Sequence, residues 1–140
     1  MQRIPARIGD ARSDIETPAL VVDLDRLEHN LDAMAEATRG LRLRPHAKSH
    51  KCSTIAKMQL ARGAVGICCQ KTDEAIALVE AGIRDVLVTN EVVAPRKIER
   101  LTALALHATV GVLVDDERVV ATLSAAATRA KEQHYLINFH

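Results

Sequence analysis

The sequence repeats one pattern, in which a short apolar run is followed by an amphipathic stretch of helical periodicity. The later apolar runs are centred near Leu43, Gly66, Leu87, Val112 and Ile137, and recur roughly every 21 to 25 residues. Apolar strands that alternate with helices are typical of parallel sheets covered on both faces. The pattern therefore predicts an α/β fold, either an open doubly wound sheet or a (β/α) barrel. The Gly-rich first turn of a dinucleotide-binding fold is absent, which favours the barrel.

The same periodicity gives the expected elements. Strands are expected over residues 17–24, 41–48, 64–69, 85–90, 109–114 and 134–139, and helices over residues 24–40, 53–63, 72–82, 94–108 and 115–130. Side chains at a helix start can accept hydrogen bonds from its free backbone N–H groups. We therefore expect Asp25 and Glu28 to form a capping box, and Ser53 and Thr72 to cap the next two helices. Pro95 is expected in the first turn of its helix.

Charge and cysteine content exclude several classes of protein. The net charge of +1 implies no strongly basic or acidic face, so we expect no nucleic-acid partner and no membrane surface. No apolar run approaches the roughly 20 residues that a membrane helix needs. The first residues are too polar for a signal peptide. Three cysteines, two of them adjacent at Cys68 and Cys69, are typical of reduced thiols, so we expect a cytoplasmic protein.

The length allows only part of a barrel. A barrel of eight units needs about 250 residues, and this chain of 140 residues has room for four or five βα units. We expect residues 1–15 to form an N-terminal arm and residues 16–140 to form the first part of a (β/α)8 barrel. The last ten residues, KEQHYLINFH, hold the only Tyr and the only Phe. This break in composition indicates a truncation or a shifted reading frame, or else a natural C-terminal strand.

The segment RPHAKSHKC, residues 44–52, gathers cationic side chains without an acidic neighbour. Side chains alternate along a strand, and residues 41, 43, 45 and 47 are apolar, so they would face the helices. The other face would carry Arg42, Arg44, His46 and Lys48. Lys48 would then lie near the carboxyl end of its strand, where barrel enzymes have their active site. Lys51 has the opposite parity.

Lys48 is therefore a candidate catalytic residue. Burial and like charge both disfavour the ammonium form of such a lysine, and a neutral amine forms a Schiff base with an aldehyde. Two alternatives remain open for this segment. One is a solvated cationic loop over a helix start. The other is a metal site built from His46, His50 and Cys52, whose side chains are common zinc ligands.

Three stretches resemble the N-terminal barrel half of the D-threonine aldolase and D-serine dehydratase family. These are pyridoxal-phosphate enzymes of fold type III, with an alanine-racemase-like barrel. The stretches are TPALVVDLDRLEHNL, LRPHAKSHKC and GAVGICCQKTDEAIALVEAGIRDVLVTNEVV, and the resemblance runs from about Glu16 to about Ala130. The segment CCQK is most similar to the aldolases, which include 3-hydroxy-D-aspartate aldolases.

The resemblance implies a set of cofactor-binding residues. Lys48, the first lysine of RPHAKSHK, would carry pyridoxal 5'-phosphate, and strand alternation selects the same residue. Gln70 and Asn90, at the ends of the next two strands, would contact the cofactor, with Asn90 the weaker candidate. His46 and His50 complete the set, and His50 would orient the lysine or the cofactor ring. Local roles are the alternatives: Gln70 as a strand cap, Asn90 in a turn, and His50 in a loop hydrogen bond.

The resemblance also implies a reaction. A D-3-hydroxy amino acid, such as D-threonine or 3-hydroxy-D-aspartate, would be cleaved by retro-aldol chemistry into an aldehyde or glyoxylate-type product and glycine. A divalent metal, Mn²⁺ or Mg²⁺, would acidify the β-hydroxyl. Its ligands are expected beyond residue 140, so we expect these residues alone to be inactive. The complete form would be a homodimer. The alternatives are a D-serine dehydratase, an inactive fragment, and a non-catalytic cofactor-binding protein.

Overall fold

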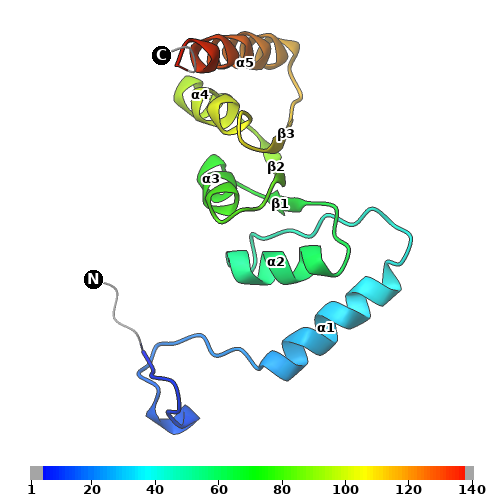
Figure 1. Cartoon of the computed structure of the whole chain (residues 1–140), viewed down its shortest axis with the longest axis vertical. Helices are drawn as coiled ribbons and strands as arrows, with labels where there is room; N and C mark the ends of the chain where they lie inside the picture. Colours follow the sequence, from blue (N-terminus) through cyan, green and yellow to red (C-terminus); the bar gives the residue numbers. More distant parts are fainter. Residues whose placement is uncertain (1–4, 138–140) are drawn as a thin grey trace. The chain divides into compact units, whose positions relative to one another are not determined.

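The computed structural model describes residues 5–137, with side chains through residue 133. The chain divides into two compact units, residues 1–30 and residues 31–140. The first unit contains the short 3₁₀ helix η1 (Arg12–Asp14), and the second contains the sheet (Figure 1). Helix α1 (Leu24–Ala37) begins in the first unit and ends in the second.

The strand predicted over residues 17–24 is wrong. Residues 17–23 pair with no strand among the described residues, and α1 already begins at Leu24. Leu20 is 91% exposed, and Val21 and Val22 are exposed as well. An apolar run becomes a strand only when a neighbour takes up its backbone N–H and C=O groups. The part of the chain that the structure describes supplies no such neighbour.

Helix α1 is confirmed, but it starts with a different cap. The side chain of Asp23 accepts a hydrogen bond from the backbone N–H of Arg26 at 3.1 Å. This places Asp23 at the N-cap position and leaves Asp25 inside the first turn. The capping box predicted from Asp25 and Glu28 is therefore wrong, because the helix begins one residue after the nearest preceding aspartate.

The second unit alternates strands and helices as predicted. The three strands are parallel and lie in the order β1-β2-β3, which confirms the α/β fold. Pro95 opens its helix as expected, whereas Ser53 and Thr72 are the first residues of their helices rather than the caps. The elements are α2 (Ser53–Ala61), β1 (Ile67–Cys69), α3 (Thr72–Glu80), β2 (Asp85–Glu91), α4 (Pro95–Leu104), β3 (Thr109–Leu113) and α5 (Glu117–Ile137).

The strand predicted over residues 134–139 is wrong where it can be compared with the structure. Residues 134–137 continue helix α5, and residues 138–140 lie outside the described residues. No Gly or Pro occurs between residues 117 and 137. A helix that meets neither of these residues has no strong local reason to stop, and this outweighs the strand preference of the Tyr and Ile near its end.

One face of the sheet packs against α3 and α4, which lie on the same side of the strands (Figure 1). The strand residues of this face are fully buried, and Leu78, Ile98 and Leu101 of the two helices belong to the same core cluster. Residues of the opposite parity, such as Leu87 and Thr89, are only half-buried. The candidate site lies on this second face. The fully buried strand residues of the first face are Ile67, Cys69, Val86 and Val88.

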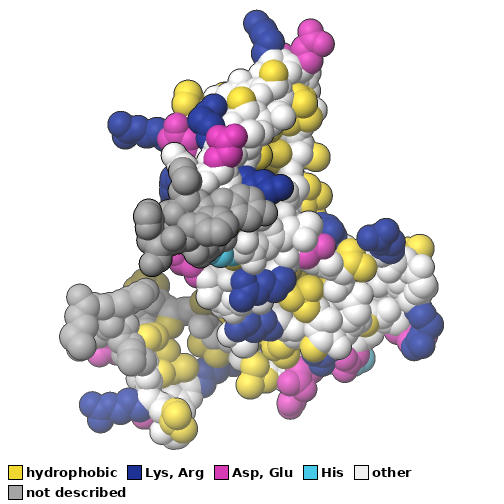
Figure 2. Space-filling model, turned by 45° about the horizontal axis from the view of Figure 1, so that its top comes forward, with side chains coloured by type: hydrophobic (Ala, Val, Ile, Leu, Met, Phe, Trp, Pro, Cys, Tyr) yellow, Lys and Arg dark blue, Asp and Glu magenta, His cyan; other side chains and the backbone are white. Residues whose placement is uncertain are grey.

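The surface carries charges of both signs. On the face shown in Figure 2, Lys and Arg side chains are interspersed with Asp and Glu side chains and with hydrophobic atoms. Among residues 5–137, no helix combines the length and the apolar character that crossing a membrane requires.

Candidate active site

The segment before β1 adds a short extended stretch to the sheet. The backbone N–H groups of Val65 and Cys68 donate to the carbonyl groups of Leu43 and Pro45 at 2.9 and 2.7 Å, and Ala47 N–H donates to Cys68 O at 2.8 Å. The stretch is too irregular to form a full strand, and only His46 pairs with Cys68 as an isolated parallel bridge. The strand predicted over residues 41–48 is thus present in part.

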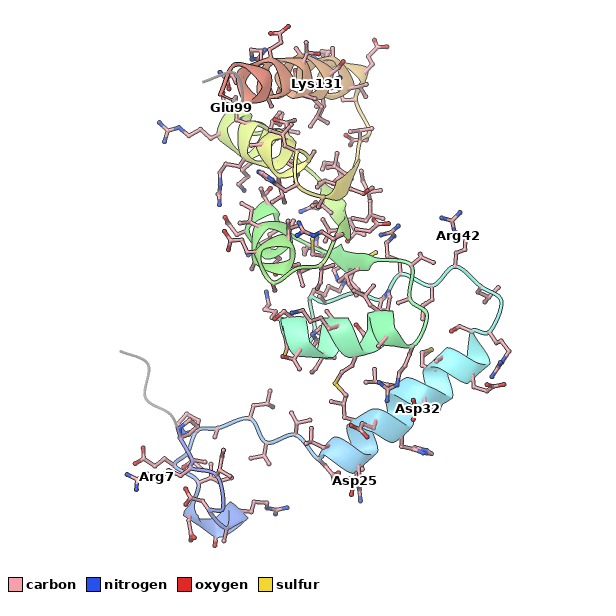
Figure 3. The ribbon with its side chains drawn as sticks, in the orientation of Figure 1. Arg7, Asp25, Asp32, Arg42, Glu99 and Lys131 are labelled. Atoms are coloured by element: carbon pink, nitrogen blue, oxygen red, sulfur yellow. The ribbon has the colours of Figure 1, made fainter. Side chains whose placement is uncertain are left out.

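Arg44 ties this stretch to β2. Its guanidinium forms a bidentate ion pair with Asp85, with Nη1–Oδ1 and Nη2–Oδ2 distances of 2.6 and 3.2 Å. The hydrogen bond with Asp85 raises the pKa of Arg44, and partial burial opposes that shift. The pair crosses Gly66, where a Cβ atom would lie 1.9 Å from Arg44 Nη1. Arg42 has the same parity but is exposed, and its side chain points away from neighbouring segments (Figure 3).

His46 lies on the same face and reaches β2. Its Nε2 atom is 2.8 Å from Thr89 Oγ1, and its Nδ1 atom accepts the backbone N–H of Lys48 at 3.1 Å. The pKa of His46 is lowered, first by burial and then by the positive charge of Lys48, while Glu74 and Gln70 oppose the shift. The alternation predicted for this segment is therefore correct for Arg44 and His46.

Lys48 itself lies in a turn, two residues beyond the bridge at His46. Its side chain is exposed, so the burial expected from strand alternation is absent. The reason is that residues 47–50 turn toward α2 and the alternation ends at the buried Ala47. Among the described residues, none forms an ion pair or a hydrogen bond with the Lys48 ammonium group.

Lys51 has a defined partner. Its ammonium group lies 2.5 Å from Glu74 Oε1, and the second carboxylate oxygen of Glu74 accepts the backbone N–H of Gln70 at 2.8 Å. The hydrogen bond from Lys51 is the main cause of the lowered pKa of Glu74, and the Gln70 N–H adds to it. Lys51 has a φ of 46°, in the left-handed region, so the backbone turns sharply at this residue. Of the two lysines, Lys48 is therefore the one with an unengaged amine.

Gln70 directly follows β1, and Asn90 lies near the end of β2. Because Cys69 is paired with Val88, the register places Gln70 beside Thr89. The Asn90 side chain donates to Gln70 O at 3.5 Å and accepts Glu91 N–H at 3.1 Å. Asn90 thus bonds backbone groups, but it does so from within β2 rather than from the turn that its local alternative supposed. The Gln70 side chain lies beside His46.

His50 makes the loop hydrogen bond that was one of its two predicted roles. Its Nδ1 atom accepts the backbone N–H of Cys52 at 3.0 Å. Burial lowers the pKa of His50, and the nearby Gln59 opposes the shift. The geometry does not make a hydrogen bond between the two side chains, so His50 Nε2 and Gln59 Oε1 are buried without a partner among the described residues.

The metal site considered for His46, His50 and Cys52 does not form. Among residues 5–137, no three His, Cys, Asp or Glu side chains come together in a way that could hold a metal ion. Both ring nitrogens of His46 and the Nδ1 atom of His50 are used in the contacts above. Burial raises the pKa of Cys68 and raises that of Cys69 to about 12, which favours the protonated thiol at both of these positions.

Three residues of this site were missed from the sequence: Asp85, Glu74 and Thr89. Asp85 and Thr89 share the parity of Leu87 in DVLVTN, so alternation applied to this strand would have placed them on the face of Arg44. Glu74 lies in the first turn of α3, where its carboxylate accepts a hydrogen bond from the backbone N–H of Gln70, just before the helix.

Comparison with known proteins identifies the family. Residues 22–139 match the family described as the N-terminal domain of alanine racemase. The chain belongs to this family. The resemblance found in the sequence is therefore confirmed, and the parallel sheet with α3 and α4 on one face is the part of the family fold described above.

Aldolases are the more similar relatives. The chain is 49% identical to the D-threonine aldolase of an Arthrobacter species over 131 residues, which is 92% of this chain and 35% of that protein. It is 49% identical to the 3-hydroxy-D-aspartate aldolase of Paracoccus denitrificans over 130 residues, which is 90% of this chain and 34% of that protein. The chain thus spans about a third of the length of the curated relatives it matches.

Solved structures agree with this ranking. The crystal structure of D-threonine aldolase from Filomicrobium marinum matches with a TM-score of 0.90 and 53% identity, over 93% of this chain and 36% of that one. The D-threo-3-hydroxyaspartate dehydratase of Delftia sp. HT23 is more distant. Its TM-score is 0.71 at 32% identity, over 86% of this chain and 31% of that one.

Proposed function

We propose that the chain is the cofactor-holding part of a pyridoxal-phosphate-dependent aldolase that cleaves D-3-hydroxy amino acids. The observation that carries the proposal is the unengaged Lys48 amine, in a turn that follows the bridge at His46, whose ring lies beside Gln70 at the carboxyl end of β1. This arrangement occurs in a chain that is 49% identical to a D-threonine aldolase and to a 3-hydroxy-D-aspartate aldolase.

The residues present fit the aldehyde end of this cofactor. Pyridoxal phosphate requires an amine that can react, and the exposed Lys48 meets that need, whereas Lys51 is held by Glu74. Gln70 offers a side-chain amide beside the site. His50 Nε2 is a buried polar atom without a partner among the described residues, as expected of a group that waits for a ligand or a water.

Each residue has a distinct task in this proposal. When bound, the cofactor stores the electron pair that is released as the Cα–Cβ bond of the substrate breaks. Lys48 is the residue that would hold the cofactor covalently, through its amine. His46 stays neutral, and so adds no positive charge beside the lysine. Gln70 and Asn90 present polar groups at the strand ends, and His50 can donate one hydrogen bond through Nε2, because its Nδ1 atom accepts the Cys52 N–H and the neutral ring therefore carries its proton on Nε2.

We extend the proposal to the architecture. The parallel order β1-β2-β3, with helices on one face, supports a segment of a (β/α)8 barrel whose inner face carries Arg44 and His46. In this arrangement residues 16–140 belong to the barrel domain and residues 1–15 form an arm. A divalent metal, a cytoplasmic location and a homodimeric assembly are the further features that we propose for the complete enzyme.

A dehydratase is the second candidate. The D-threo-3-hydroxyaspartate dehydratase of Delftia matches 89% of this chain at 33% identity, so the segment is compatible with loss of the β-hydroxyl as well as with carbon–carbon cleavage. The higher identity to the two aldolases favours the aldolase.

The first test is chemical and uses the chain itself. Pyridoxal phosphate is added, borohydride is used to fix any bond between a lysine and the cofactor, and the labelled peptide is identified by mass spectrometry. We expect the label at Lys48 and its loss in Lys48→Ala, with Lys51→Ala as the matched control that keeps it. Labelling that is equal in both variants would exclude Lys48 as the attachment site.

The second test addresses the reaction. Residues 22–139 replace the matching segment of the Filomicrobium aldolase, which shares 53% identity with this chain. We expect this chimera to release glycine from D-threonine and 3-hydroxy-D-aspartate, and the Lys48→Ala chimera to release none. Ammonia and a keto acid as the products would instead establish the dehydratase. A folded, cofactor-loaded chimera that forms neither set of products would refute both reactions.

A further inference from the structure

A continuous row of hydrogen bonds connects Lys48 to two strands. The backbone N–H of Lys48 donates to His46 Nδ1 at 3.1 Å, His46 Nε2 lies 2.8 Å from Thr89 Oγ1, and Thr89 Oγ1 donates to Cys69 O at 3.1 Å. The row starts in the turn that carries the lysine, crosses to β2, and ends on the last residue of β1. It therefore joins three segments that are far apart in the sequence.

The two ends of the row decide which atom carries each proton. A backbone N–H can only donate, so His46 Nδ1 must be unprotonated. A carbonyl oxygen can only accept, so the Thr89 hydroxyl proton points to Cys69 and the Thr89 oxygen must accept from His46. Only the neutral imidazole with its proton on Nε2 satisfies every bond. The Lys48 ammonium and the Glu74 carboxylate are the charged groups that act on this ring, with opposite effects.

We propose that His46 and Thr89 form a positioning pair that fixes the backbone of Lys48 to the sheet and so aims its amine at the strand ends. This inference rests on the proposed function of Lys48. The pair acts through the main chain, because none of its described hydrogen bonds reaches the Lys48 ammonium. Thr89 connects the pair to the sheet, since its hydroxyl accepts a hydrogen bond from His46 and donates one to the backbone of β1.

The positioning role gives the Lys48 side chain a defined starting direction, which a purely cationic loop would not. Lys48 is exposed and lies in a turn, where a long side chain samples many directions. Fixing the backbone N–H restricts the start of that side chain without using its amine. Lys51, three residues later, is controlled in a different way, through an ion pair that occupies the amine itself.

The first part of the test needs no cofactor. The exchange rate of the Lys48 amide proton with water is measured by NMR at neutral pH, in the wild-type chain, in Thr89→Val and in Thr89→Ser. Loss of about one hydrogen bond should speed this exchange about five-fold in Thr89→Val, while Thr89→Ser, which keeps the hydroxyl, should match the wild type. The ¹⁵N spectrum should show His46 neutral and protonated on Nε2. A ring protonated on Nδ1, or unchanged exchange in Thr89→Val, would overturn the proposal.

The second part uses pyridoxal phosphate as the probe. The neutral amine condenses with the cofactor aldehyde to form a C=N bond, with release of the aldehyde oxygen as water, and borohydride then delivers hydride to the carbon of that bond. The labels on Lys48 and Lys51 are counted in the same sample. We expect the Lys48-to-Lys51 ratio to fall about five-fold in Thr89→Val and to be restored in Thr89→Ser. Circular dichroism confirms that the variants are folded.

The outcomes separate this inference from the proposed function. If the wild type prefers Lys48 and Thr89→Val keeps the same ratio, the proposed function stands and the positioning role is wrong. If the wild type labels Lys51 as readily as Lys48, the proposed function fails, and the positioning role fails with it. In that case the amide exchange rates still report whether the hydrogen bonds exist.

Discussion

Replacing Gly66 by alanine should destabilise the chain, because the Arg44–Asp85 pair passes over this residue. An added Cβ atom would lie 1.9 Å from Arg44 Nη1, 2.8 Å from Arg44 Cζ and 2.9 Å from the backbone oxygen of Asp85. Gly66 does not have a positive φ, so the conflict is steric rather than conformational. The guanidinium must move away, and the bidentate pair that anchors the segment carrying His46 and Lys48 is broken.

The size of the effect follows from these contacts. Overpacking of this kind costs about 1–3 kcal/mol in free energy of unfolding. The ion pair adds to this cost, but its side chains are 24% and 37% exposed, so we assign it only about 1 kcal/mol. We therefore expect Gly66→Ala to lower the free energy of unfolding by about 2–4 kcal/mol. Urea unfolding followed by circular dichroism measures this difference directly.

A double-mutant cycle identifies the cause. In an Arg44→Ala background the first two close contacts are absent and only the Asp85 carbonyl remains near the new Cβ. The cost of Gly66→Ala should therefore be about 1–2 kcal/mol smaller in that background. An equal cost in both backgrounds would refute the reasoning, since the clash would then not involve Arg44.

Three further predictions concern the site. Gln70→Ala should weaken pyridoxal phosphate binding by about 1 kcal/mol, the usual size of one hydrogen bond, and a titration with unchanged affinity would remove Gln70 from the site. The pKa values of His46 and His50 are lowered in the folded chain, so the unfolded chain binds protons more readily. The stability that these residues contribute is therefore complete above about pH 6.5 and falls as the pH drops below it. His50→Gln should make the urea midpoint depend less steeply on pH between pH 7 and 5. Lys51→Ala removes the ion pair with Glu74, in which the lysine side chain is largely exposed, so it should lower the free energy of unfolding in urea by only about 0.2–1 kcal/mol. The variant should still capture the cofactor, and a loss of capture would contradict the distinction between the two lysines.

The alternation of strands and helices could be predicted from the sequence because it is written in local hydrophobic periodicity. The strands at 64–69, 85–90 and 109–114 were all found, within a few residues at their ends. The error at 17–24 has a cause that lies outside the run itself. Whether an apolar run forms a strand depends on a partner strand that lies elsewhere in the chain, and periodicity contains no information about that partner.

The site shows the same limit at the level of single residues. Alternation placed Arg44 and His46 on the correct face, because both lie in the extended stretch. It selected Lys48 for burial, and there it was wrong, because the chain turns after Ala47. The position of a turn is decided by contacts such as Lys51 N–H with Ala47 O, which join residues across the turn and break the two-residue repeat.

The identity of Lys48 as the attachment residue therefore rests on a different argument from the one that the sequence suggested. Burial does not single out this lysine, since its side chain is exposed. Glu74 forms an ion pair with the Lys51 amine, whereas no described residue forms an ion pair or a hydrogen bond with the Lys48 amine. Glu74 can do this because its carboxylate already receives the N–H of Gln70, which fixes it at the start of α3. The first-turn glutamate of α3 thus occupies the Lys51 amine and leaves Lys48 as the amine available to an aldehyde.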